Sequence, residues 1–237
     1  MSERDPLLPW LIFTGLTLFA FILLWYFGLI QRMMESDHTY ISPIICVLYV
    51  LSSLHCLWRI LIVSREGAAA EKTGEAVARE GIDAPAGTGL VARHIRDLIT
   101  KAAHQRGKRL DQTLLLRVLA DRLKGSNAFG AFASDTMLKL GLLGTIIGFI
   151  IMLAPIGALD PENKAAVRSS MSLMSGGMAV AMYTTLVGLA ASILLKIQYA
   201  MLDSATAKIF AFAVDLTEVH VVSVLEGSAV KSGSSAE

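Results

Sequence analysis

Long apolar runs alternate with polar stretches along this chain, and the pattern predicts four membrane-spanning helices. Each run is long enough to cross a hydrocarbon core of about 30 Å at about 1.5 Å per residue. The polar stretch between the second and third runs contains two patterns of helical period, from Leu90 to Gln105 and from Leu110 to Leu123. Beyond the fourth run, apolar residues continue at helical spacing with no Gly or Pro to interrupt them, which predicts that this helix extends out of the membrane.

The predicted fold class is an all-α membrane protein. It has four transmembrane helices, the last extended into the cytoplasm, and cytoplasmic helices between spans two and three. The expected parts are transmembrane helix 1 (7–30), transmembrane helix 2 (41–63), a cytoplasmic helical loop (64–135), transmembrane helix 3 (136–157), transmembrane helix 4 (170–195), a cytoplasmic helical extension (196–226) and a disordered tail (227–237). The start of the loop is poor in large apolar residues and is expected to be flexible or weakly helical.

Charge gives the orientation of these spans. Twelve Lys and Arg residues lie in 64–134, whereas the other two loops, 31–40 and 158–168, hold one and two. The positive-inside rule places the large loop in the cytoplasm and, with four spans, both termini as well. The basic loop has no interleaved aromatic residues and the net charge is only +1, so nucleic acid is not an expected partner.

Candidate chemistry outside spans three and four is sparse. His55 and Arg59 share a helix face in span two, but both lie near its end, where Arg59 is expected to reach the lipid headgroups. A functional role for this pair stays open. His94 and His104 in the basic loop are expected to be solvated. The sequence contains no nucleophile–base set, metal cluster or phosphate loop, so an enzyme and a resident cofactor are not expected.

Spans three and four carry small residues at helical spacing, which let two backbones approach closely in lipid. We expect these positions to form helix contacts: Gly141, Gly144, Gly148, Gly177, Ala181 and Gly188.

Threonines stand on the same small-residue faces. Thr145 is nine residues in from Thr136, and Thr185 is ten residues from Leu195, so two antiparallel spans bring their hydroxyls to similar depth. A Thr hydroxyl can bond its own helix or line an aqueous path, and the residues alone leave both readings open. With Thr184, these threonines are the candidate ion pathway. Since no Asp or Glu lies within either span, a proton path needs a carboxylate from another chain, and Na⁺ bound by oxygens is the alternative.

The segments GLLGTIIGFIIML and SGGMAVAMYTTLVGLAASILL resemble the MotA/TolQ/ExbB family of ion-driven motor channels. The resemblance implies a homo-oligomer of five copies in the inner membrane around a dimer of single-span MotB/TolR/ExbD-like partners that carry the ion-binding Asp. It implies that flow of H⁺ or Na⁺ drives mechanical work on the cell envelope. It matches Thr145 and Thr185 to pore threonines, and Thr184 to a threonine of sodium-type members.

Four features separate the chain from particular branches of that family. Val180 stands where ExbB-like proteins often have Glu, and four spans with both ends inside look more like MotA. The loop between spans two and three is shorter than in flagellar stators and lacks a recognisable charged torque helix. A flagellar-type stator and a non-conducting membrane scaffold therefore remain alternatives to a non-flagellar motor.

Overall fold

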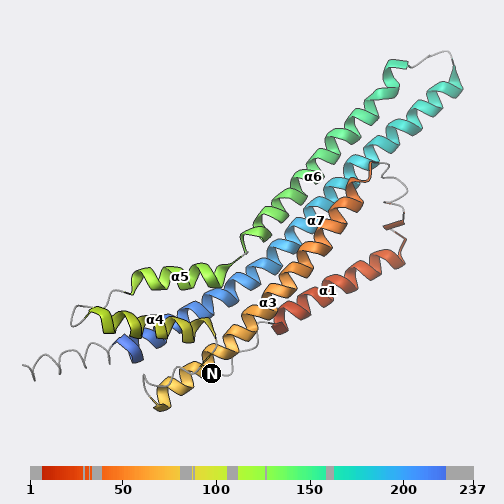
Figure 1. Cartoon of the computed structure of the whole chain (residues 1–237). Helices are drawn as coiled ribbons and strands as arrows, with labels where there is room; N and C mark the ends of the chain where they lie inside the picture. The colour runs from red at the N-terminus through yellow and green to blue at the C-terminus, as the bar shows by residue number, and fades with distance from the viewer. Residues whose placement is uncertain are drawn as a thin grey trace, which may run out of the picture. The chain divides into compact units, whose positions relative to one another are not determined.

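The computed structural model describes residues 7–28, 30–31, 33, 39–80, 87, 89–105, 112–125, 127–158 and 163–222. All regular secondary structure in these residues is helical, and four helices are long and apolar enough to cross a membrane (Figure 1). The predicted all-α class with four spans is confirmed. The elements are α1 (Leu7–Tyr26), α3 (Ile41–Glu80), α4 (Leu90–Gln105), α5 (Thr113–Lys124), α6 (Ala128–Leu153), a 3₁₀ turn (Ala154–Ala158), α7 (Lys164–Leu216) and a π-helical turn (Thr217–Val222).

Three helices are longer than the apolar runs that predicted them. α6 begins at Ala128 rather than near 136, and α7 begins at Lys164 rather than near 170. α7 then continues unbroken to Leu216, in keeping with the predicted extension. An apolar run marks what lipid can cover, whereas a helix ends where its backbone hydrogen bonds end. The predicted tail at 227–237 lies outside the described residues.

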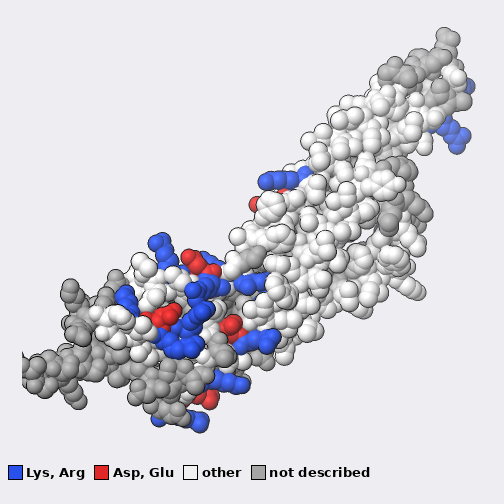
Figure 2. All heavy atoms as spheres, viewed as in Figure 1, with Lys and Arg blue, Asp and Glu red and all other residues white. Residues whose placement is uncertain are grey.

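The chain divides into two compact units. The first, called here the membrane unit, comprises Leu8–Leu57 and Ala128–Ala200, with α1, α6 and the first parts of α3 and α7. α1 has one buried side chain, Trp10, and exposes a row of Leu, Phe and Ile, as expected of a helix in contact with lipid. The second, called the polar unit, comprises Met1–Leu7, Trp58–Asn127 and Met201–Glu237. Figure 2 shows most of the Lys, Arg, Asp and Glu side chains of this face gathered around α4 and α5.

The core of the polar unit explains why α3 continues past its span. Residues 64–80, expected to be flexible or weakly helical, are instead regular helix. Small and branched residues at helical spacing are buried there against α4, α5 and the end of α7, and that burial stabilises the helix. The core residues are Ala70, Val77, Val91, Ile95, Leu119, Leu123, Ala213, Leu216 and Val221.

α4 has the apolar face that its period predicts, with Val91, Ile95 and Leu98 fully buried. The expectation that His94 is solvated is wrong, because His94 is only 4% exposed. It follows Val91 by three residues and precedes Leu98 by four, so it shares their face. Burial lowers the pKa of His94, and the nearby Asp97 carboxylate offsets part of that effect. His104 is exposed, as expected.

The spacing of Leu110, Leu114, Leu115 and Val118 predicts an apolar face for α5, and this prediction is wrong for Leu114 and Val118. Leu114 is 73% exposed and Val118 is exposed, whereas Leu119 and Leu123 are buried. Three consecutive leucines begin this helix, so the pattern allows more than one phase, and the structure uses the one that continues through Leu115, Leu119 and Leu123.

Candidate functional site

α6 and α7 lie side by side with their backbones in contact (Figure 1). A Cβ added at Gly148 would lie 2.6 Å from the backbone N of Ala181, and one added at Gly177 would lie 2.5 Å from the backbone N of Met152. A Cβ at Gly188 would lie 2.8 Å from the Cα of Gly141. Any side chain larger than hydrogen at these positions would separate the helices, because real Cβ contacts below 3.0 Å are essentially never seen.

Gly144 forms a notch for Thr184. A Cβ at Gly144 would lie 2.3 Å from Thr184 Oγ1 and 2.4 Å from Thr184 Cβ. Thr184 is fully buried, and its hydroxyl donates to Val180 O at 2.9 Å. Of the three threonines predicted for an ion pathway, Thr184 is therefore covered by α6.

Thr145 and Thr185 lie together on a more open side of the same helix pair. The Thr185 hydroxyl donates to Ala181 O at 3.1 Å and to Gly141 O across the helix pair at 3.3 Å. The α-helical bond pattern makes Gly141 O the acceptor of the Thr145 N–H as well. The structure thus brings Thr145 and Thr185 to one level beside a shared carbonyl. Both are half-buried, and the Thr145 hydroxyl donates to Leu142 O at 2.6 Å.

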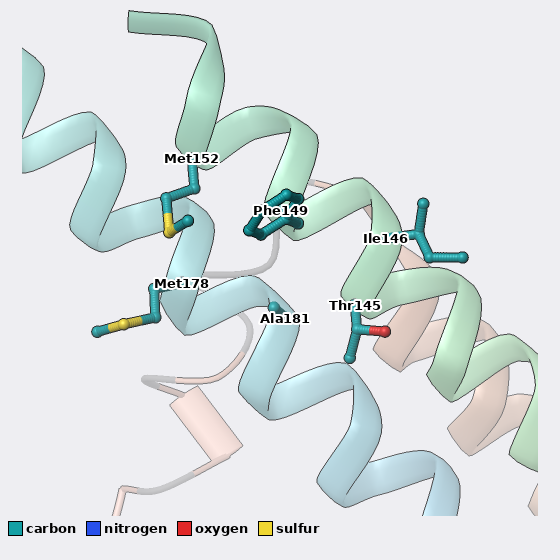
Figure 3. A pocket seen from close by; sticks show the side chains of 6 residues that line it. All are labelled: Thr145, Ile146, Phe149, Met152, Met178 and Ala181. Carbon is teal, nitrogen blue, oxygen red and sulfur yellow. The ribbon is translucent and has the colours of Figure 1, made fainter. Parts of the chain in front are cut away.

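A groove of about 540 Å³ adjoins Thr145. Figure 3 shows its six side chains, four from α6 and two from α7, and Thr145 carries the hydroxyl among them. The others are apolar: Ile146, Phe149, Met152, Met178 and Ala181. An apolar groove with one polar residue at its edge can receive an apolar helix that brings a single polar group to that edge.

The geometry also limits the chemistry at this level. Each threonine gives its hydrogen to a carbonyl, which leaves oxygen lone pairs on Thr145 and Thr185 to accept a hydrogen bond or coordinate a cation. Among the described residues, no group of three or more His, Cys, Asp or Glu could hold a metal ion. The sequence has no Asp or Glu in 136–157 or in 170–195, so neither apolar run supplies a carboxylate beside these hydroxyls.

Arg59 has a role that the sequence did not reveal. Its Nη2 donates to Leu123 O at 3.0 Å and Lys124 O at 3.1 Å, the last carbonyls of α5, and lies 3.3 Å from Asn127 Oδ1. A cation at a helix C-terminus satisfies carbonyls that the helix cannot and complements its dipole. The guanidinium of Arg59 therefore caps α5, a contact that the sequence pattern did not predict.

His55 belongs to an aromatic contact within the membrane unit. His55 Nδ1 lies 2.7 Å from the Tyr199 hydroxyl, and its ring packs edge-on against Phe129 at 5.0 Å between centroids. A Cβ at Gly130 would lie 2.2 Å from the Tyr199 ring, so this glycine makes room for the tyrosine. The sequence pointed to His55 but not to Tyr199 or Gly130, which are more than 70 residues away along the chain.

This fold and this helix pair define a multi-pass membrane protein whose last two spans pack through glycine and present hydroxyls on one side. The model of the MotA/TolQ/ExbB proton channel family matches residues 70–212, more than half of the chain, and the chain belongs to that family. It is accordingly a membrane channel protein and not an enzyme. Comparison with curated proteins and with solved structures gives no match. The family resemblance predicted from spans three and four is confirmed.

Proposed function

We propose that this chain is the pentamer-forming subunit of an ion-driven motor in the bacterial inner membrane, with both termini in the cytoplasm. H⁺ or Na⁺ passes Asp residues of a single-span MotB/TolR/ExbD-like partner dimer, and the flow is coupled to mechanical work on the cell envelope. The observation that carries the proposal is the shared level of Thr145 and Thr185 beside the Gly141 carbonyl, next to an open apolar groove.

In this proposal the half-buried Thr145 and Thr185 have a different role from the buried Thr184. Thr145 and Thr185 face the partner helix and offer hydroxyl oxygens to its carboxylate or to a cation. Thr184 fills the Gly144 notch and fixes how α7 sits on α6. Gly141, Gly148, Gly177, Ala181 and Gly188 keep the two backbones close enough for the hydroxyls to act together.

The partner is needed for a chemical reason. A threonine hydroxyl does not titrate near neutral pH, so it can pass on a hydrogen bond but cannot store a proton. The sequence from Thr136 to Leu195 has only two acids, Asp160 and Glu162, and both fall between the two spans. A proton-storing carboxylate beside Thr145 must therefore come from a partner chain.

The test is ion flux through the complex of this chain with its single-span partner in proteoliposomes. A pH-sensitive or Na⁺-sensitive dye inside the vesicles reports flux under each gradient alone, which also identifies the coupling ion. The Thr145→Ala/Thr185→Ala double variant should carry at least about tenfold less flux. Two hydrogen bonds of about 1 kcal/mol each remove about 2 kcal/mol of ion stabilisation, and about 1.4 kcal/mol is already tenfold in rate. Oligomer mass and partner capture should be unchanged.

Thr136→Ala is the matched control. Thr136 also lies on α6 and its hydroxyl donates to its own helix, to Phe132 O at 2.8 Å, but it is two turns and more away from Thr145. Flux in this variant should equal that of the native chain. Unchanged flux in the double variant would sink the pathway, and native flux that is absent with either ion would favour a scaffold.

A further inference from the structure

Gln198 is a fully buried amide within the membrane unit, where α7 meets α1 and α3. Its Nε2 lies 3.4 Å from Thr14 Oγ1 of α1 and 3.4 Å from Tyr49 Oη of α3. These contacts are longer than the usual 2.7–3.2 Å of N–H···O bonds. The amide is therefore weakly held for a group that has left water completely.

The other end of this amide has no hydrogen-bond partner among the described residues. Gln198 Oε1 is buried and unpaired. Exchanging the oxygen and nitrogen of the amide would pair the oxygen with the two hydroxyls and leave the NH₂ group unpaired instead. Either orientation leaves one end of Gln198 unsatisfied, and lipid tails cannot supply the missing bond.

Two more buried polar atoms without a partner in the described chain lie one helical turn from the residues that Gln198 contacts. Trp10 Nε1 belongs to a side chain that is 4% exposed, and Trp10 precedes Thr14 by four residues on α1. Ser52 Oγ belongs to a fully buried residue that follows Tyr49 by three on α3. Residues three or four apart on a helix have Cβ atoms about 5–6 Å apart on the same face. Three helices thus carry buried, unpaired polar side chains within about one helical turn of the contacts of Gln198.

We infer that this region is a buried hydration site, in which water bridges Gln198, Ser52 and Trp10 between α1, α3 and α7. The groups present suit water: an indole N–H that only donates, an amide oxygen that only accepts and a hydroxyl that does both. A buried water commonly makes about three such bonds. None of these groups is charged, so the site favours a neutral ligand over an ion. It lies on α1, α3 and α7, whereas the proposed ion pathway lies on α6 and α7.

This site also accounts for the attachment of α1. In lipid, apolar surface gives little drive for helices to associate, so polar contacts and close packing decide which helices pair. Trp10 is the single buried side chain of α1, and Thr14 makes the contact of α1 to Gln198. Bridging water would give a hydrogen bond to each of the three unpaired buried atoms. These bonds would hold the first span to the rest of the membrane unit.

The experiment uses the full chain with ¹⁵N-labelled tryptophan in lipid bilayers and measures magnetisation transfer from water to each indole N–H by solid-state NMR. The three indole signals are assigned by Trp→Phe variants at Trp10, Trp25 and Trp58. The native chain should show transfer to the Trp10 indole at short mixing times. Gln198→Met and Ser52→Ala should each reduce it at least threefold, with the Trp25 and Trp58 signals unchanged.

Two results would overturn the inference. One is the absence of water transfer to Trp10 in the native chain. The other is transfer that persists in both variants, which would mean that Trp10 is hydrated from the membrane surface. Ser52→Ala removes one oxygen atom only, so it tests the site even if Gln198→Met disturbs the packing of α7. Thr206→Ala is the matched control, because Thr206 is buried on α7 with its hydroxyl bonded to Leu202 O at 2.9 Å.

Discussion

Replacing Gly177 with alanine should force α6 and α7 apart, whereas the same change at the adjacent Gly176 should not. A Cβ at Gly177 would lie 2.5 Å from Met152 N and 2.8 Å from Gly148 O, both backbone atoms that cannot turn away. A Cβ at Gly176 would meet nothing within 4 Å. Overpacking of this kind costs about 1–3 kcal/mol. Alanine in an open helical position gains roughly 0.5–1 kcal/mol over glycine.

Both variants share the gain in helix propensity, so Gly177→Ala should be less stable than Gly176→Ala by the overpacking cost alone. That cost is about 1–3 kcal/mol, a factor of roughly 5 to 160 in the unfolding equilibrium. Reversible unfolding of the purified chain by SDS in mixed micelles, followed by tryptophan fluorescence, measures this difference. The two variants have the same composition and the same helix, so effects on helix propensity and detergent binding cancel. Equal stability of the two would refute the backbone-to-backbone packing of α6 on α7.

Two further predictions concern the polar unit. Arg59→Ala should leave the last carbonyls of α5 without their donor at a cost of about 1–2 kcal/mol, so that limited proteolysis cleaves α5 several-fold faster than in the native chain. Arg65→Ala, on the same helix, is the control, and equal cleavage rates in the two variants would contradict the cap. His94 has a lowered pKa in the folded chain, so the unfolded chain binds more protons. Stability should therefore fall as pH drops below the unfolded value of about 6.5, and His94→Leu should flatten that dependence in thermal unfolding of the full chain measured between pH 7.5 and 5. An unchanged pH dependence in His94→Leu would rule out this histidine as its source.

The spans were predictable because lipid imposes a simple rule of length and hydropathy on them. The polar unit was less predictable, since there the helices are placed by contacts between distant segments. The leucines at the start of α5 permit more than one face, and only burial of Leu119 and Leu123 against α3 and α4 selects one. The continuation of α3 past its span likewise depends on Ala70 and Val77 finding partners on other helices.

At the candidate site, the spacing in the sequence located the small residues and the threonines. It could not show which threonine is buried between the helices and which is more open. Thr184 and Thr185 are neighbours in sequence, and adjacent helical residues point about 100° apart, so one can be buried while the other is more open. The structure shows which is which, because Gly144 receives Thr184. The partners of Arg59 and His55 were beyond sequence analysis for another reason: each lies more than 60 residues away along the chain.

The Gly144 notch has a geometric consequence for the proposed pathway. Thr184 fits opposite a residue with no side chain, and its neighbours along α6 at that level are Leu143 and Thr145. Gly144 has no side chain, but Leu143 and Thr145 do. If α7 slid by one residue, about 1.5 Å, or rotated about its axis, the Thr184 side chain would leave the space at Gly144 and collide with a neighbouring side chain of α6. The notch therefore acts as a register key. It fixes the relative heights of Thr145 and Thr185, although Thr184 itself does not line the groove.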